Sequence, residues 1–161
     1  MEEKRSARGK RILIVDDEPD ILGSLKDLLD MCSIDTAPDF ETARDLLEKN
    51  PYDAAVLDIM GVRGYDLLAL TTQKDIPTLM LTAHALSPDN FVRSVKGGAG
   101  AYVPKERITE IEIFLLDVLE AREKGEKGLG KWFTRLEDFF EKKFGSYWKE
   151  KSSPDFWKKF Y

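Results

Sequence analysis

The feature that most constrains this chain is a set of three short apolar segments that each end on a polar residue. They are Ala54–Leu57 before Asp58, Arg11–Val15 before Asp16-Asp17, and Thr78–Leu81 before Thr82. Short apolar runs of this kind are typical of strands that are buried on both faces of a parallel sheet. Open α/β sheets carry their binding residues beyond the carboxyl ends of the strands. We therefore expect three carboxylates and a hydroxyl to meet at one edge of a sheet.

Helical patterns alternate with the apolar segments along the chain. The expected strands are 10–15, 33–37, 54–57, 78–82 and 101–103, and the expected helices are 19–29, 39–49, 65–72, 87–96 and 109–122. Asp39 and Ser87 are predicted helix caps, and Thr109 with Glu112 matches a capping box. Five repeats of strand and helix predict parallel strands joined by right-handed crossovers, with helices on both faces. The predicted fold is a five-stranded, doubly wound α/β sheet of the flavodoxin-like kind.

Length and composition fit one domain with an appendage. The chain has 161 residues, of which 42% are hydrophobic and 34% charged, as in soluble globular proteins. No run approaches the roughly 18 to 20 apolar residues of a membrane span. The N-terminus lacks the apolar stretch of a secretory signal, and Cys32 is the only cysteine. We therefore expect a cytoplasmic protein, with Cys32 as a small core side chain.

Charge is distributed unevenly. Residues 1–121 hold 14 basic and 23 acidic side chains, for a net charge of −9, whereas residues 122–161 hold 11 basic and 7 acidic ones, for +4. An acidic body does not suit nucleic acid, because contacts with phosphates supply most non-specific affinity. We expect a flexible arm over residues 1–9, the α/β domain over 10–124 and a helical tail over 125–161.

The tail is rich in aromatic residues. It holds 11 of the 17 aromatic side chains, and a stripe at helical spacing comprises Trp132, Phe133, Leu136, Phe139, Phe140 and Phe144. Gly145 should end that helix, and Ser153-Pro154 should begin a last short one. Two interpretations remain open. The stripe packs on the domain or on a second copy, or it is an output element that binds a partner or a membrane surface.

The carboxylates at the predicted sheet edge favour metal and phosphate chemistry. Asp16, Asp17 and Asp58 would repel one another if they were ionised a few ångströms apart. A hard cation such as Mg²⁺ relieves this repulsion, and it typically binds one or two carboxylates, waters and a phosphate. A carboxylate beside such an ion can attack a phosphoryl group and form an aspartyl phosphate. A lysine and the metal would neutralise the oxygens of the transferring group.

The order of these residues resembles the receiver domain of two-component response regulators. The resemblance rests on Asp16-Asp17, Asp58, Thr82-Ala83, Tyr102 and Lys105, and it covers residues 10 to about 122. It implies that Asp58 is the phospho-acceptor, served by a sensor histidine kinase, a phosphotransfer protein or a small phosphodonor. It also implies a switch of protein–protein contacts, with an output protein or a homodimer as the readout. The tail is too short for a usual DNA-binding output domain.

The same resemblance assigns roles to the surrounding residues. It implies that Mg²⁺ is bound by Asp17, by Asp16 through a water, by Asp58 and by the backbone carbonyl of Met60. Lys105 would pair with the phosphoryl oxygens. Thr82 would donate its hydroxyl to the phosphoryl group, and Tyr102 would turn inward into the space that Thr82 vacates. The protein would act by accepting phosphate and not as an enzyme on other substrates.

Two departures from the family pattern stand out. Receivers commonly have proline after the lysine, with a cis bond, whereas Glu106 follows Lys105 here. A cis bond before a non-proline residue costs about 2.5 to 4 kcal/mol, so we expect a trans bond. The loop over residues 59–64 is about two residues shorter than is usual. A phosphate-independent interaction module is therefore an alternative function.

Three residues near the predicted site, Tyr102, His84 and Asp16, have alternative interpretations. Tyr102 is as consistent with a core aromatic as with a switch, and His84, the only histidine, is expected to be a loop residue. A second alternative from another class is a Mg²⁺-dependent phosphatase with Asp16 as its nucleophile. Such an enzyme usually carries a second acid two residues later, where this chain has Glu18.

Overall fold

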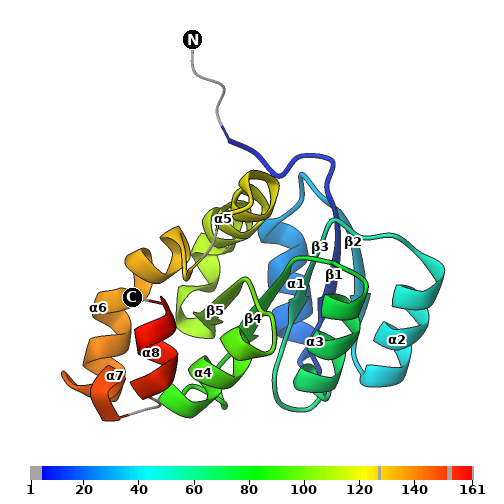
Figure 1. Cartoon of the computed structure of the whole chain (residues 1–161). Coiled ribbons are helices and arrows are strands. Elements are labelled where there is room, and N and C mark those ends of the chain that lie inside the picture. Colours follow the sequence, from blue (N-terminus) through cyan, green and yellow to red (C-terminus); the bar gives the residue numbers. More distant parts are fainter. Residues whose placement is uncertain (1–4, 127, 152–153, 161) are drawn as a thin grey trace.

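Five parallel strands form the central sheet, in the order β2-β1-β3-β4-β5 (Figure 1). The computed structural model describes residues 5–126, 128–151 and 154–160. The strands are β1 (Arg11–Val15), β2 (Ser33–Ala37), β3 (Ala54–Leu57), β4 (Thr78–Thr82) and β5 (Ala101–Pro104). The helices are α1 (Pro19–Leu28), α2 (Phe40–Lys49), α3 (Gly64–Gln73), α4 (Pro88–Lys96), η1 (Lys105–Glu110, a 3₁₀ helix), α5 (Ile111–Lys124), α6 (Lys131–Phe144), α7 (Trp148–Lys151) and α8 (Pro154–Phe160). The predicted doubly wound fold is confirmed.

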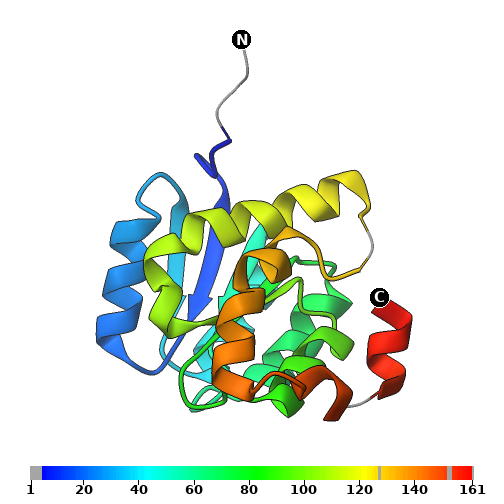
Figure 2. The same ribbon diagram turned by 90° about the vertical axis from the view of Figure 1, so that its left-hand side faces the viewer.

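Helices cover both faces of the sheet. Helices α1 and α5 lie on one face, and α2, α3 and α4 lie on the other (Figures 1 and 2). Every residue of β3 and β4 is buried, which explains why β3 is apolar throughout and β4 is apolar between its terminal threonines. Over the described residues, no helix combines the length and the apolar character needed to cross a membrane.

Two of the three helix caps predicted in the α/β domain are present in the structure, and one is not. Asp39 accepts a hydrogen bond from the amide of Thr42 at 2.8 Å, and Ser87 accepts one from Asn90 at 3.1 Å. The capping box expected at Thr109 is wrong, because α5 begins directly from η1 and no side chain caps it. The amide of Ile111 donates instead to the carbonyl of Ile108 in the 3₁₀ turn.

The N-terminal segment packs on the domain where the structure describes it. Residues 5–9 fall in the expected flexible arm, yet Ala7 is fully buried and Arg5 lies 2.7 Å from Glu120 and 3.4 Å from Asp117. The thiol of Cys32 donates to the carbonyl of Ala7 at 3.3 Å. Cys32 is half-buried, so it lies at the border of the core and not inside it.

The C-terminal tail folds back onto the domain beside α4, β5 and α5 (Figures 1 and 2). The predicted stripe is confirmed in α6, where four of its side chains are buried: Trp132, Phe133, Leu136 and Phe140. Arg135 of α6 forms two hydrogen bonds, of 2.7 and 3.2 Å, with the buried Asp117 of α5. Helix α7 was not predicted, and the expected cap Ser153 lies outside the described residues. Of the two interpretations of the tail, packing on its own domain is the one observed.

Candidate functional site

Strand register brings the predicted carboxylates together. Val15 of β1 pairs with Leu57 of β3, so the residues that follow them, Asp16 and Asp58, leave the sheet side by side. The amide of Asp58 donates to the carbonyl of Val15 at 2.9 Å, which continues the ladder to the edge. Because the strands are parallel, both side chains emerge at the carboxyl edge, as the sequence predicted. Both are buried, with 2% of Asp16 and 4% of Asp58 exposed.

Lys105 lies between these carboxylates. Its amine is 2.8 Å from Asp16 Oδ2, 3.4 Å from Glu18 Oε1 and 3.6 Å from Asp58 Oδ2. Only 7% of its side chain is exposed, so this is not a solvated surface lysine. All described peptide bonds are trans, including the one from Lys105 to Glu106. The expectation of a trans bond is confirmed, and Lys105 nevertheless reaches the acidic pocket.

Burial and charge perturb the two central groups in the pocket. Burial, with the neighbouring charge of Asp16, raises the pKa of Asp58 to about 6, although Lys105 acts in the opposite direction. Burial disfavours the charged amine of Lys105, but the hydrogen bond to Asp16 and the nearby carboxylates outweigh it, so the pKa of Lys105 is raised. Lys105 therefore stays protonated beside a carboxylate whose ionised form is disfavoured by burial and by the charge of Asp16.

Two glycines shape the short loop after Asp58. A Cβ on Gly64 would lie 2.1 Å from the backbone oxygen of Asp58, and one on Gly61 would lie 2.3 Å from Asp17 Oδ2. The loop therefore passes close to both carboxylate-bearing segments, and only glycine fits at Gly64 without a shift of the backbone. Met60 is in this loop with an exposed side chain.

Three consecutive acidic residues form a group of oxygen donors that could hold a metal ion. Carboxylate oxygens of Asp16, Asp17 and Glu18 lie within 4.8 Å of one another. Glu18 was not expected among the metal ligands, although its place directly after the Asp pair was a signal for it. Hard oxygen donors at this spacing suit Mg²⁺. Asp58 adjoins the group across the amine of Lys105.

Thr82 and Tyr102 are connected through one residue of the loop after β4. Thr82 Oγ1 accepts a hydrogen bond from the amide of Ala85 at 3.1 Å, and the hydroxyl of Tyr102 donates to the carbonyl of Ala85 at 2.6 Å. Both side chains are fully buried. His84 lies in the same loop with 74% of its side chain exposed, 3.9 Å from Glu18. It is a loop residue, as predicted.

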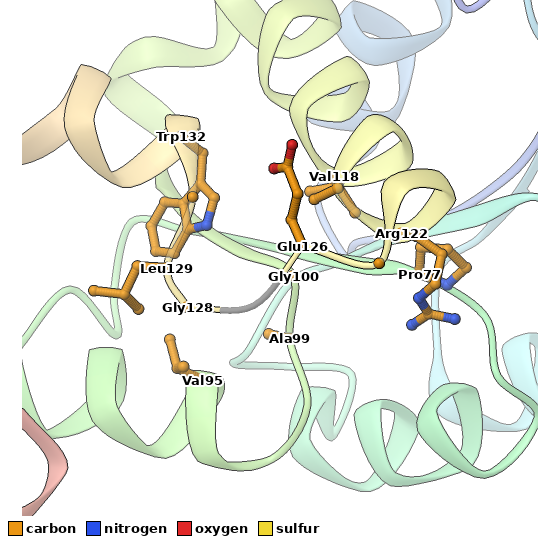
Figure 3. A pocket seen from close by; sticks show the side chains of 13 residues that line it. Pro77, Val95, Ala99, Gly100, Val118, Arg122, Glu126, Gly128, Leu129 and Trp132 are labelled. Carbon is orange, nitrogen blue, oxygen red and sulfur yellow. The ribbon is translucent and has the colours of Figure 1, made fainter. Parts of the chain in front are cut away.

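A separate hollow of about 250 Å³ lies where α5 meets the tail (Figure 3). Val95, Val118, Leu129 and Trp132 line it together with Arg122 and Glu126. None of the predicted site residues contributes to its wall. The acidic pocket at the sheet edge is therefore the candidate functional site.

The fold and the pocket define a flavodoxin-like α/β domain with an acidic pocket and an opposing lysine at the carboxyl edge of its sheet. Residues 12–114 match the family of response regulator receiver domains. The chain belongs to this family, and its domain is a receiver of two-component signalling.

Curated relatives of the chain include regulators from a plant and a bacterium. The chain is 36% identical over 112 residues to the two-component response regulator ARR10 of Arabidopsis thaliana, an alignment that covers 65% of this chain and 20% of the plant protein. It is 42% identical over 98 residues to the heme response regulator HssR of Staphylococcus aureus, covering 58% and 43% of the two chains. The chain thus spans less than half the length of these relatives.

Solved receiver domains share the fold. A CheY-like receiver domain protein from Methanospirillum hungatei JF-1 superposes with a TM-score of 0.65 at 29% identity, over 73% of this chain and 98% of the other. The receiver domain of the Francisella response regulator 1452 gives a TM-score of 0.62 at 27% identity, over 71% and 99% of the two chains. These domains match most of their own length, whereas about a quarter of this chain lies outside the alignments.

Proposed function

We propose that Asp58 accepts a phosphoryl group and that the chain is a phosphorylation-controlled switch in two-component signalling. The observation that supports this most directly is the position of Lys105, whose amine lies 3.6 Å from Asp58 and 2.8 Å from Asp16. A phosphoryl group on Asp58 would bring new anionic oxygens next to this amine. A buried ammonium stabilises such charge better than water does, because the local dielectric constant is low.

In the proposed reaction, a carboxylate oxygen of Asp58 forms a bond to phosphorus while the bond from phosphorus to the donor breaks. The donor, a phosphohistidine of a sensor kinase or phosphotransfer protein or a small phosphodonor, leaves with the bonding electron pair. Lys105 offsets the negative charge on the oxygens of the phosphoryl group during the transfer. Asp58 must be ionised to react. Because its pKa is raised, its reactivity should increase when positive charge offsets the negative charge of the neighbouring carboxylates.

The donor set of the pocket fits Mg²⁺. Mg²⁺ would be held by Asp17 directly, by Asp16 through a water, by Asp58 and by the backbone carbonyl of Met60, with Glu18 as an added candidate. Bound Mg²⁺ supplies positive charge that offsets both the carboxylates and the incoming phosphoryl group. The tight loop over Gly61 and Gly64, which brings this segment against Asp17, supports the assignment.

Thr82 and Tyr102 are the proposed switch. The Thr82 hydroxyl would turn to donate to the phosphoryl group, and this would disturb its hydrogen bond from Ala85, the residue that Tyr102 also contacts. Phosphorylation adds about 1.5 to 2 negative charges, enough to bias a two-state loop. The readout would be a protein contact with an output protein or a second copy.

The geometry is less favourable for a phosphatase with Asp16 as nucleophile. Asp16 Oδ1 accepts a hydrogen bond from the amide of Glu18 at 2.9 Å, and Oδ2 pairs with Lys105 at 2.8 Å. Both carboxylate oxygens of Asp16 are therefore already engaged in close contacts within the domain. These contacts support Asp58 in preference to Asp16 as the phospho-acceptor.

Mass analysis after treatment with acetyl phosphate and Mg²⁺ tests the proposal. We expect wild type and the surface control Asp66→Ala to gain one phosphoryl group, and Asp58→Ala to gain none. A label on Asp16 would favour the phosphatase, and no label on wild type would favour a phosphate-independent interaction module.

A further inference from the structure

The tail packs around one phenylalanine of α4. The ring of Phe91 is fully buried, and five tail rings have centroids 5.3 to 5.7 Å from it: Trp132, Phe133, Phe140, Trp148 and Trp157. Aromatic pairs at such distances stabilise a packed cluster beyond their buried area. The three tail helices thus form one body with α4 and with the neighbouring strand β5, which carries the chain into Lys105.

Phe140 contacts the segment on one side of Lys105. Its ring centroid lies 6.1 Å from that of Tyr102, three residues before the lysine. Phe140 and Tyr102 are both fully buried, and the Tyr102 hydroxyl is held by the carbonyl of Ala85. In this buried position the Tyr102 ring packs against Phe140 of the docked tail, so the tail supports the segment that leads into Lys105.

Lys143 contacts the segment on the other side. Its amine lies 3.0 Å from a carboxylate oxygen of Glu106, the residue directly after Lys105. Both partners are about half exposed, with 59% of Glu106 and 46% of Lys143 accessible, so the pair is a weak tether. Phe140 and Lys143 are neighbours on one face of α6. One helix of the tail therefore contacts the chain before and after the lysine.

We infer that the tail is a positioning element for Lys105, with Phe140 and Lys143 as its positioning residues. By fixing residues 102–106 from both sides, the tail holds the amine where it can pair with the oxygens of a phosphoryl group on Asp58. A displacement of about 1 Å at such a contact is enough to weaken it strongly. The inference rests on the proposed function, and it makes the tail part of the phosphoryl-binding machinery.

Two affinities measured on the full chain separate positioning from general damage. Beryllofluoride in saturating Mg²⁺ imitates a phosphoryl group and would contact Lys105, whereas Mg²⁺ alone binds carboxylates and is repelled by the lysine. The variants are Phe140→Ala and Lys143→Gln, and Lys142→Gln is a matched control for the second. Lys142 is exposed, lies on the same helix and loses the same charge. Beryllofluoride binding is followed by ¹⁹F NMR and Mg²⁺ binding by calorimetry.

We expect Phe140→Ala to weaken beryllofluoride binding about five- to tenfold and Lys143→Gln about twofold, since an exposed ion pair contributes little. Lys142→Gln should match wild type, and the affinity for Mg²⁺ alone should be kept in every variant. In the double variant Glu106→Gln/Lys143→Gln, the Lys143 substitution should have no further effect, because the ion pair is already lost.

Equal loss of both affinities in Phe140→Ala would make the tail a merely structural support and overturn the inference. Unchanged or tighter beryllofluoride binding in that variant would overturn it as well. In those cases wild type still binds beryllofluoride, so the proposed function survives. Failure of wild type itself to bind beryllofluoride would instead overturn the proposed function and this inference together.

Discussion

Lys105 and Asp16 form a 2.8 Å ion pair in which 7% of one side chain and 2% of the other are exposed. The two residues come from opposite ends of the domain sequence and meet only because β1 and β5 both end at the same edge of the sheet. A buried pair of this kind strongly destabilises a protein when one partner is removed, because the other charge stays buried without compensation.

Replacement of Lys105 should therefore destabilise the metal-free protein. Lys105→Met leaves Asp16 and Asp58 facing each other without a cation, and we expect a loss of about 3 kcal/mol at pH 7.5 in urea unfolding. Added Mg²⁺ should restore more stability to this variant than to wild type. The exposed Lys96→Met is the control. A loss that is the same in both variants would show that Lys105 has no special electrostatic role.

The pKa of Asp58 predicts an unusual pH dependence of stability. The folded protein has a pKa of about 6 at this group, above the ordinary value of 3.8 that the unfolded chain should keep. The folded state therefore holds a proton that the unfolded state has already released. The contribution of Asp58 to metal-free stability should therefore fall as the pH rises from about 4 to about 6, by up to about 3 kcal/mol. Urea titrations across this range measure the effect.

Asp58→Asn is the matching control for that titration. The amide cannot ionise, so the variant should lack this contribution to the fall and be more stable than wild type above pH 6 without Mg²⁺. Identical pH profiles for the two proteins would contradict the assignment of the raised pKa to Asp58.

The loop after Asp58 should not accept a side chain at Gly64. Gly64→Ala would place a methyl group 2.1 Å from a backbone oxygen that cannot move without disturbing β3, and we expect a loss of at least about 2 kcal/mol. Gly23→Ala is the control, since nothing lies within 4 Å of a Cβ there. That substitution, inside α1, should stabilise the protein by about 0.5 to 1 kcal/mol. Equal thermal shifts in the two variants would rule out the steric explanation.

Docking of the tail should depend on Phe91. Phe91→Ala removes the ring at the centre of the aromatic cluster, and losses of about 3 to 5 kcal/mol are usual for such truncations. Amide exchange over α6 to α8 should then rise by orders of magnitude, while that of β1 and β3 should change least. Val95→Ala is the control on the same helix, and Val95 is half-buried in wild type. The amides of the tail should exchange more slowly in Val95→Ala than in Phe91→Ala. Exchange that rises evenly over the chain would argue that tail and domain unfold as one unit.

Local sequence patterns were sufficient for most of the fold. The five strands, the caps Asp39 and Ser87 and the aromatic stripe of α6 each have a pattern that is visible within a few neighbouring residues, so they can be predicted before their tertiary contacts are known. The prediction of a capping box at Thr109 failed because a 3₁₀ turn occupies this place and leads directly into α5. The unpredicted helix α7 is only four residues long, and its start carries a tryptophan that is buried against the domain.

The candidate site was predictable as a set of residues but not as an arrangement. Asp16, Asp17, Asp58, Thr82 and Lys105 stand at strand ends, and parallel strands must bring such positions to one edge. Glu18 and the place of Lys105 between the carboxylates depend on side-chain packing across the edge. The bond from Lys105 to Glu106 could be predicted as trans, yet the reach of the amine could not.

By itself, the sequence determined the alternation of strands and helices and the acidic residues that end the strands, because both follow from the local pattern of apolar and polar side chains. The tertiary structure alone decided that Lys105 pairs most closely with Asp16, that Ala85 connects Thr82 to Tyr102, and that the tail covers Phe91. These contacts join residues far apart in the chain. Their free energy depends on the shape and burial of surfaces that exist only once the sheet has formed.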